Sequence, residues 1–223
     1  MAAIVQTFSK KKLPAGFGSQ GPVSLVDSFQ WGWTAKDRQN VEPGLEVLPQ
    51  TSGFFCLIDD PRCNNNGIRK TAGVSFPDGQ GRPEFFVDHN DGTVTYSNCG
   101  ARLYWANVHV PPGGKVQFHY IFLRGQWNNP FNAFAQFLAV RANGEIVRKS
   151  TFAQTRGPGP AESGQYYRWR AHEPIPFPEG FDGTLQWVVS NGERRNKGDF
   201  LNVHPNTDCY PSGLAVDFIS IIS

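Results

Sequence analysis

The sequence contains no apolar run that approaches the roughly 18 residues needed to cross a bilayer. Long stretches rich in Ala, Leu, Glu and Lys are also missing, and the chain has a single Met. The formal net charge is only +2, which is too small to create a general field for polyanions. These absences exclude a helical membrane protein, disfavour a helix-rich fold and lower the expectation of nucleic-acid binding.

Motifs typical of several enzyme classes are missing as well. We find no G-x-S-x-G, no H-E-x-x-H, no P-loop and no clustered carboxylate motif such as E-x-D-x-x-E. A glycosidase needs only two carboxyl groups at the right separation, and distant strands can supply them. We therefore predict a protein that is not an enzyme, with a polysaccharide hydrolase as an alternative.

What the sequence does contain is typical of strands joined by turns. Gly (24 residues) and Pro (17 residues) separate short apolar runs, and aromatic residues make up 13% of the chain. Aromatic and β-branched residues favour strands, while Gly and Pro favour turns. At 223 residues the chain has the length of one sandwich domain. We predict an all-β fold, an antiparallel β-sandwich of the jelly-roll type.

The first 22 residues differ in composition from the rest of the chain. They combine a short apolar start, three adjacent lysines and a segment rich in Gly and Pro. We predict an extended N-terminal arm over residues 1–22 and a single β-sandwich domain over residues 23–223. Adjacent lysines usually mean only a solvated tail, but a segment laid on a neighbouring subunit is a known mode of association. The arm residues expected to contact a protein partner or a second copy are Ile4, Val5, Phe8, Lys10, Lys11 and Lys12.

The cysteines and the N-terminal residues bear on the cellular compartment. The apolar N-terminal residues precede the lysines and are too few for a secretory signal. We therefore expect synthesis in the cytoplasm, where thiols stay free. Cys56 and Cys63 bracket a turn-rich loop, so a disulfide between them is the alternative after exposure to an oxidising space. The sequence contains no C-x-x-C pair that would suggest a zinc site.

Apolar runs closed by turn residues predict about a dozen strands. The clearest hairpins cover residues 85–96, with Asn90, Asp91 and Gly92 in the turn, and residues 102–123, with a Pro-Pro-Gly-Gly turn. The register of the second hairpin sends His109 and His119 to opposite faces, which disfavours a shared metal. Residues 132–137 fit a short helix or a strand equally well. Further strands are expected near residues 134–140, 145–152, 183–191 and 213–222.

Two short motifs have competing interpretations. The string G-x-G-x-x-G at Gly16, Gly18 and Gly21 would hold a pyrophosphate if a strand preceded it and a helix came after it. Neither is predicted, so we interpret the string as part of the arm. Residues 88–92 (DHNDG) offer oxygen ligands for calcium, but a tight turn between strands needs the same residue types.

Aromatic residues are the best candidates for a binding surface. Flat rings stack on the apolar faces of sugars, while neighbouring amides bind the hydroxyl groups. Trp127 lies among turn-forming residues, where we expect an exposed ring. Core packing is the alternative for every large aromatic residue. The predicted carbohydrate-binding residues are Trp127, Asn128, Asn129, Tyr166 and Trp169.

The segment YYRWR (residues 166–170) interleaves basic and aromatic side chains. Platforms for single-stranded nucleic acid have this composition. Strand alternation explains it as well, because it sends Tyr166, Arg168 and Arg170 to one face and Tyr167 and Trp169 to the other. Without a wider basic surface, nucleic acid stays the less favoured partner.

Two stretches resemble the jelly-roll carbohydrate-binding modules. They are residues 119–147, where a strand leads through an Asn-rich turn into another strand, and residues 211–222. In that family a last strand carrying an Asp closes the sandwich, and some members hold a structural calcium nearby. The resemblance implies glycan binding and places Asp217 at the matching position, with structural calcium as the only cofactor it suggests.

The chain also looks like the small jelly-roll proteins that tailed bacteriophages build into virions as decoration, collar or tail-attachment components. The similarity is one of layout, an extended arm and then a sandwich rich in Gly, Asn and Phe. It implies a structural protein that docks through residues 1–22 and is incorporated into a virion. This is the leading hypothesis from the sequence, and a glycan-binding module is the second.

Overall fold

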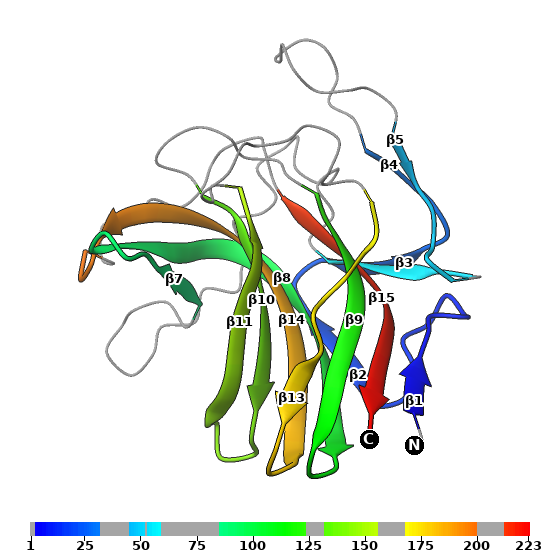
Figure 1. Ribbon diagram of the computed structural model, residues 1–223. Coiled ribbons are helices and arrows are strands. Elements are labelled where there is room, and N and C mark those ends of the chain that lie inside the picture. Colours follow the sequence, from blue (N-terminus) through cyan, green and yellow to red (C-terminus); the bar gives the residue numbers. More distant parts are fainter. Residues whose placement is uncertain are drawn as a thin grey trace.

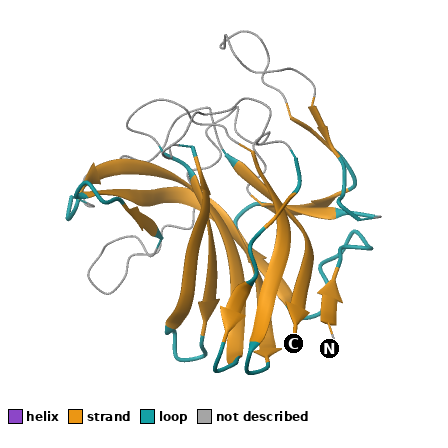
Figure 2. Ribbon diagram, viewed as in Figure 1, coloured by secondary structure: helices purple, strands orange, loops and turns teal. Residues whose placement is uncertain are grey.

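The computed structural model describes residues 3–31, 45–51, 53–58, 85–123, 132–155, 168–199 and 212–223. Within these ranges the chain forms fifteen strands and no helix (Figure 2). The strands make two large antiparallel sheets, stacked face to face, and one two-stranded ribbon (Figure 1). The predicted all-β antiparallel sandwich is therefore confirmed. No helix of the described ranges is long and apolar enough to cross a membrane.

The first sheet has seven strands, and the long strand near the C-terminus lies at its middle. Its main path runs in the order β12, β9, β15, β6, β3, while β1 also pairs with β15 and β13 with β9. The strands are β1 (Ala3–Gln6), β3 (Val23–Val26), β6 (Phe55–Ile58), β9 (Gly114–Leu123), β12 (Arg170–Ala171), β13 (Ile175–Phe177) and β15 (Gly213–Ile222).

The second sheet has six strands and contains the two longest. Its path runs in the order β11, β10, β14, β8, β2, and β7 pairs with the first part of β8. The strands are β2 (Phe17–Gln20), β7 (Phe86–Asp88), β8 (Thr93–Val110), β10 (Phe134–Val140), β11 (Ile146–Gln154) and β14 (Phe181–Asn196). The strands expected near residues 134–140, 145–152, 183–191 and 213–222 are all present, so residues 134–137 belong to a strand.

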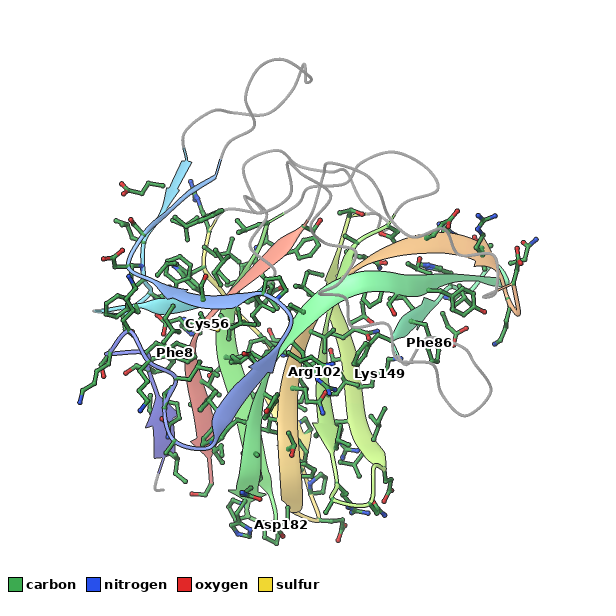
Figure 3. All side chains as sticks on the ribbon, turned by 180° about the vertical axis from the view of Figure 1, so that it is seen from behind. Phe8, Cys56, Phe86, Arg102, Lys149 and Asp182 are labelled. Carbon is green, nitrogen blue, oxygen red and sulfur yellow. The ribbon has the colours of Figure 1, made fainter. Side chains whose placement is uncertain are left out.

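The main core fills the space between the two sheets. Alternate residues of each strand point inward, as the two-residue period of a strand requires. Trp187 and Leu103 come from the six-stranded sheet, and Phe118 and Val216 from the seven-stranded sheet. Phe8 and Cys56, labelled in Figure 3, belong to the same cluster.

The outer faces of both sheets are partly covered. The ribbon of β4 (Phe29–Trp31) and β5 (Leu45–Val47) places Phe29 and Val47 against the seven-stranded sheet. Phe85 and Val87 cover part of the six-stranded sheet. This double coverage explains why β6 and β10 are buried on both faces and show little alternation in the sequence.

The hairpin predicted for residues 85–96 is confirmed. Phe86 pairs with Tyr96 and Asp88 with Val94, and the turn between them has Gly92 at φ +81°. The carboxylate of Asp91 accepts hydrogen bonds from the backbone N–H of Thr93 at 3.1 Å and from its hydroxyl at 2.6 Å. The DHNDG segment is thus a turn that its own side chains close.

The hairpin predicted for residues 102–123 is wrong. β8 and β9 do not pair, because β8 lies in the six-stranded sheet and β9 in the seven-stranded sheet. Val110 pairs with Phe181 instead, and Gly114 with Phe177. The Pro-Pro-Gly-Gly segment therefore crosses between sheets, since a tight turn within a sheet and a crossing between sheets need the same turn residues. His109 and His119 consequently lie in different sheets.

The N-terminal segment is built into the sandwich. β1 pairs with β15, and β2 pairs with β8, so residues 3–20 contribute to both sheets. Phe8 is only 1% exposed, and its ring meets that of Phe17 edge to face at 5.8 Å. The structure thus packs residues 3–20 against the rest of the same chain. These residues do not form the extended arm that was predicted for residues 1–22.

Candidate functional site

A pocket of about 220 Å³ opens between the edges of the two sheets. Strand β9 forms one wall and β11 the other, and Arg168 and Arg170, just before and at the start of β12, complete the lining. Its lining combines aromatic faces with hydrogen-bonding and cationic side chains. The lining residues are Tyr120, Phe122, Thr151, Phe152, Ala153, Gln154, Arg168 and Arg170.

The aromatic wall comes from Tyr120 and Phe152. Phe152 is the extra residue of a β-bulge on β11, since Ala135 pairs with Ala153 and Gln136 with Thr151. The ring of Phe152 meets the ring of Tyr120 edge to face at 4.7 Å. The hydroxyl of Tyr120 donates a hydrogen bond of 3.4 Å to the carbonyl of Phe152. This wall therefore offers both apolar ring surface and a polar tip.

The phenol of Tyr120 is protonated at neutral pH. Burial raises the pKa of Tyr120 above its usual value, and the nearby positive charge of Arg170 opposes this shift in part. Its single O–H is donated to the Phe152 carbonyl, so the phenol oxygen can accept a hydrogen bond from a ligand.

The cationic side of the pocket comes from alternate residues of one extended segment. Arg170 pairs with Tyr120 across β12 and β9, so its side chain shares the face of Tyr120. Arg168, two residues earlier, also lines the pocket, whereas Trp169 between them points away. The alternation predicted for residues 168–170 is thus confirmed.

The β11 wall is held by hydrogen bonds on the outer face of the six-stranded sheet, because Gln136 alternates with the core residues Ala135 and Phe137. Gln136 donates from Nε2 to the Thr151 hydroxyl at 2.9 Å, and Asn132 donates from Nδ2 to Oε1 of Gln154 at 3.3 Å. Both donors are fully buried. These bonds fix the side chains of Thr151 and Gln154 against the outer face of the six-stranded sheet, where Thr151 pairs with Gln136 and Gln154 with Phe134.

No protein-family model matches the sequence, and a search of curated proteins finds no relative. Solved structures do show similarity in shape. One is a cleaved adhesin domain of Lys-gingipain from Porphyromonas gingivalis, with 11% identity, a TM-score of 0.41 and coverage of 100% of this chain and 99% of that chain.

Another is the CBM22-1 xylan-binding domain of Xyn10C from Paenibacillus barcinonensis, with 9% identity, a TM-score of 0.38 and coverage of 98% and 92%. A third is the enzymatically active domain of tailspike protein 4 of bacteriophage CBA120, with 9% identity and a TM-score of 0.37. It covers 92% of this chain but 19% of the tailspike chain.

The predicted sugar-binding residues fall into two groups. Trp127, Asn128, Asn129 and Tyr166 lie outside the described residues, so their role stays a prediction. Trp169 is half-buried, and its indole N–H donates a hydrogen bond of 2.7 Å to the carbonyl of Leu48. Its ring meets Phe55 edge to face at 5.6 Å. Trp169 thus anchors residues 168–170, which carry the two arginines of the pocket, to the outer face of the seven-stranded sheet.

Asp217, the predicted calcium ligand, has a structural role in the described chain. It is fully buried, and its Oδ2 accepts hydrogen bonds from the backbone N–H and the hydroxyl of Thr51 at 3.1 and 3.2 Å. Its Oδ1 accepts one from the N–H of Phe218, which has φ +49°. Asp217 therefore stabilises a bulge in β15 that keeps Val216 and Ile219 both facing the core.

The disulfide between Cys56 and Cys63 is not present. Cys56 is a free thiol on β6, fully buried in the main core, while Cys63 lies outside the described residues. Burial, and secondly the charge of Asp217, raise the pKa of the Cys56 thiol far above its usual range. The side chain is therefore a small apolar group of the core, because its alternate position on β6 points it between the sheets.

Sequence analysis missed Tyr120 and Phe152 as site residues. Both lie in strands that the sequence predicts, but the pocket exists only because β9 and β11 belong to different sheets and their edges face each other. The sequence did contain one signal for the site. Arg168 and Arg170 lie on the same face of an extended segment, so the two positive charges are close together wherever that face packs.

Proposed function

We propose that this protein is a non-catalytic glycan-binding module, and that the pocket between β9 and β11 holds a sugar. The observation that carries the proposal is the combination of ring surface from Tyr120 and Phe152 with the guanidinium N–H donors of Arg168 and Arg170 in the pocket lining. Amphipathic sugars need this pairing of apolar faces with fixed polar groups.

The size of the pocket sets the expected mode of binding. Its volume of about 220 Å³ is below the roughly 300–1,000 Å³ of sites that enclose drug-sized ligands. The pocket therefore suits one ring of a longer glycan or a terminal sugar. Affinity for a single sugar would be modest, and repeated copies of the module on one particle would raise it.

A glycan screen of the purified full-length protein tests this proposal. We expect binding to a defined set of glycans, and we expect Tyr120→Leu to weaken it about tenfold because ring contact and a hydroxyl are both lost. The matched control is Tyr104→Leu, since Tyr104 is also half-exposed but lies on the outer face of the six-stranded sheet. If no glycan binds, or if both variants bind like the unaltered protein, the proposal is wrong.

A second candidate is the assembly role that the sequence predicts, such as a virion component. Its specific support is β1, which has β15 as its single neighbour among the described strands. The side chains of Ile4 and Val5 are 50% and 44% exposed there. An exposed edge strand with apolar side chains is a template for pairing with another chain, and we propose a second copy as that chain.

Light scattering after size exclusion tests this assembly role. We expect oligomers of the full-length protein and monomers of an Ile4→Lys, Val5→Lys variant, because charged residues on an edge strand oppose pairing. Point variants are needed because deleting residues 1–22 would also remove Phe8 and β2 from the sandwich. A monomeric unaltered protein would refute self-assembly through β1.

A further inference from the structure

The charge of the pocket points to a narrower class of ligand than glycans in general. Two of its lining residues, Arg168 and Arg170, are cations, and no carboxylate lines it among the residues that the structure describes. The pocket therefore presents positive charge beside a surface for a sugar ring.

The direction of the two arginines is fixed by what surrounds them. Trp169, between them, is held by its hydrogen bond to Leu48 and by its contact with Phe55. Arg170 is also held by backbone pairing with Tyr120. Because successive side chains of an extended segment alternate, anchoring Trp169 on one side turns Arg168 and Arg170 to the other. The cations thus face the pocket before any ligand binds.

The guanidinium group suits one anion in particular. It is planar and presents a rigid fork of N–H donors that matches the two oxygens of a carboxylate. Beside this fork, the rings of Tyr120 and Phe152 offer apolar surface. The ligand that meets both features is a ring with one apolar face and a carboxylate at its edge.

We propose that the pocket selects sugars that carry a carboxylate, as uronic acids and sialic acids do. This inference rests on the proposed glycan-binding function and adds the charge of the ligand to it. Arg168 binds the carboxylate, Arg170 adds positive charge beside it, and Tyr120 and Phe152 contact the ring. No bond is made or broken.

Calorimetric titration of the full-length protein tests the charge requirement. The probes are galacturonate oligosaccharides and their methyl esters, which keep the ring and lose the charge, and then glucuronate and sialyl oligosaccharides with their neutral counterparts. We expect the acid to bind at least about tenfold more tightly than the ester in one of these pairs. That preference should shrink as salt is added.

Three variants locate the preference. Arg168→Gln should remove the difference between acid and ester, while Arg168→Lys should keep part of it because the charge stays and the fork is lost. Arg141→Gln is the matched control, since Arg141 is an exposed arginine in the turn between β10 and β11. Thermal melts of all three confirm that each variant is folded.

The outcomes separate the two proposals. If glycans bind but every acid and its neutral counterpart bind equally, the charge requirement is wrong and glycan binding stands. If no glycan binds at all, both are wrong. Equal binding of uronates, sulfated dextran and single-stranded DNA would also overturn the inference, because the site would then be a general polyanion surface.

Discussion

Phe8→Ala tests most directly whether the N-terminal segment packs into the core of its own chain. Phe8 is 1% exposed in the main core, its ring contacts Phe17, and its carbonyl accepts a hydrogen bond of 2.9 Å from the N–H of Phe54. Removing a buried phenylalanine side chain costs about 3–5 kcal/mol, from lost transfer free energy and from the cavity left behind. The backbone bond to Phe54 stays, so the loss reports side-chain packing alone.

That cost translates into a large shift in melting temperature. For a domain of about 150–250 residues, each 1 kcal/mol lowers Tm by about 2–4 °C, so we expect a decrease of about 6–20 °C. Circular dichroism melts and urea titrations of the full-length protein measure it. Ile4→Ala is the control, because Ile4 is 50% exposed and its replacement should change stability by about 0.5 kcal/mol or less.

The result that refutes this reasoning is a Phe8→Ala variant that melts with the unaltered protein. Residues 3–8 would then not be part of the folded core of a single chain, and an arm that reaches a different molecule would be favoured. A decrease that depends on protein concentration would indicate the same, because packing within one chain does not depend on concentration.

Three further predictions concern the sheets and their buried groups. Gly100→Ala should destabilise the protein by about 1–3 kcal/mol or more in urea titrations, because a Cβ there would lie 2.0 Å from the Val189 carbonyl oxygen. Thermal stability should fall as the pH drops below about 6.5, since burial lowers the pKa of His172 and the unfolded chain then binds a proton that the folded chain does not. His172→Phe should flatten that dependence, and an unchanged slope would contradict it. Iodoacetamide should leave Cys56 unlabelled in the native protein and label it in urea, as peptide mass mapping can establish.

Local patterns predicted the strands well and the pairing between them poorly. The hairpin at residues 85–96 was predictable because its strands are adjacent and Asp91 and Gly92 specify the turn. The pairing of Val110 with Phe181 joins residues far apart in the sequence. No turn signal reports such a contact, so the Pro-Pro-Gly-Gly segment was assigned to the wrong connection.

The candidate site shows the same division. Alternation alone put Arg168 and Arg170 on one face, and the structure confirms it. The residues that lie opposite the two arginines are determined by how the two sheets pack. Tyr120 lies beside Arg170 because the two residues pair across β9 and β12. Trp169 was a candidate for sugar stacking because a sequence shows an aromatic residue but not the carbonyl of Leu48 that receives its N–H.

The position of β15 has a consequence for how the chain is made. β15 comes after every other described strand in the sequence, yet it lies between β9 on one side and β6 and β1 on the other. During synthesis, β6 and β9 therefore leave the ribosome well before the strand that joins them, and each exposes an unpaired edge until then. A truncation that removes residues 213–223, and with them all of β15, should cost solubility during expression far more than a truncation of similar length ordinarily does.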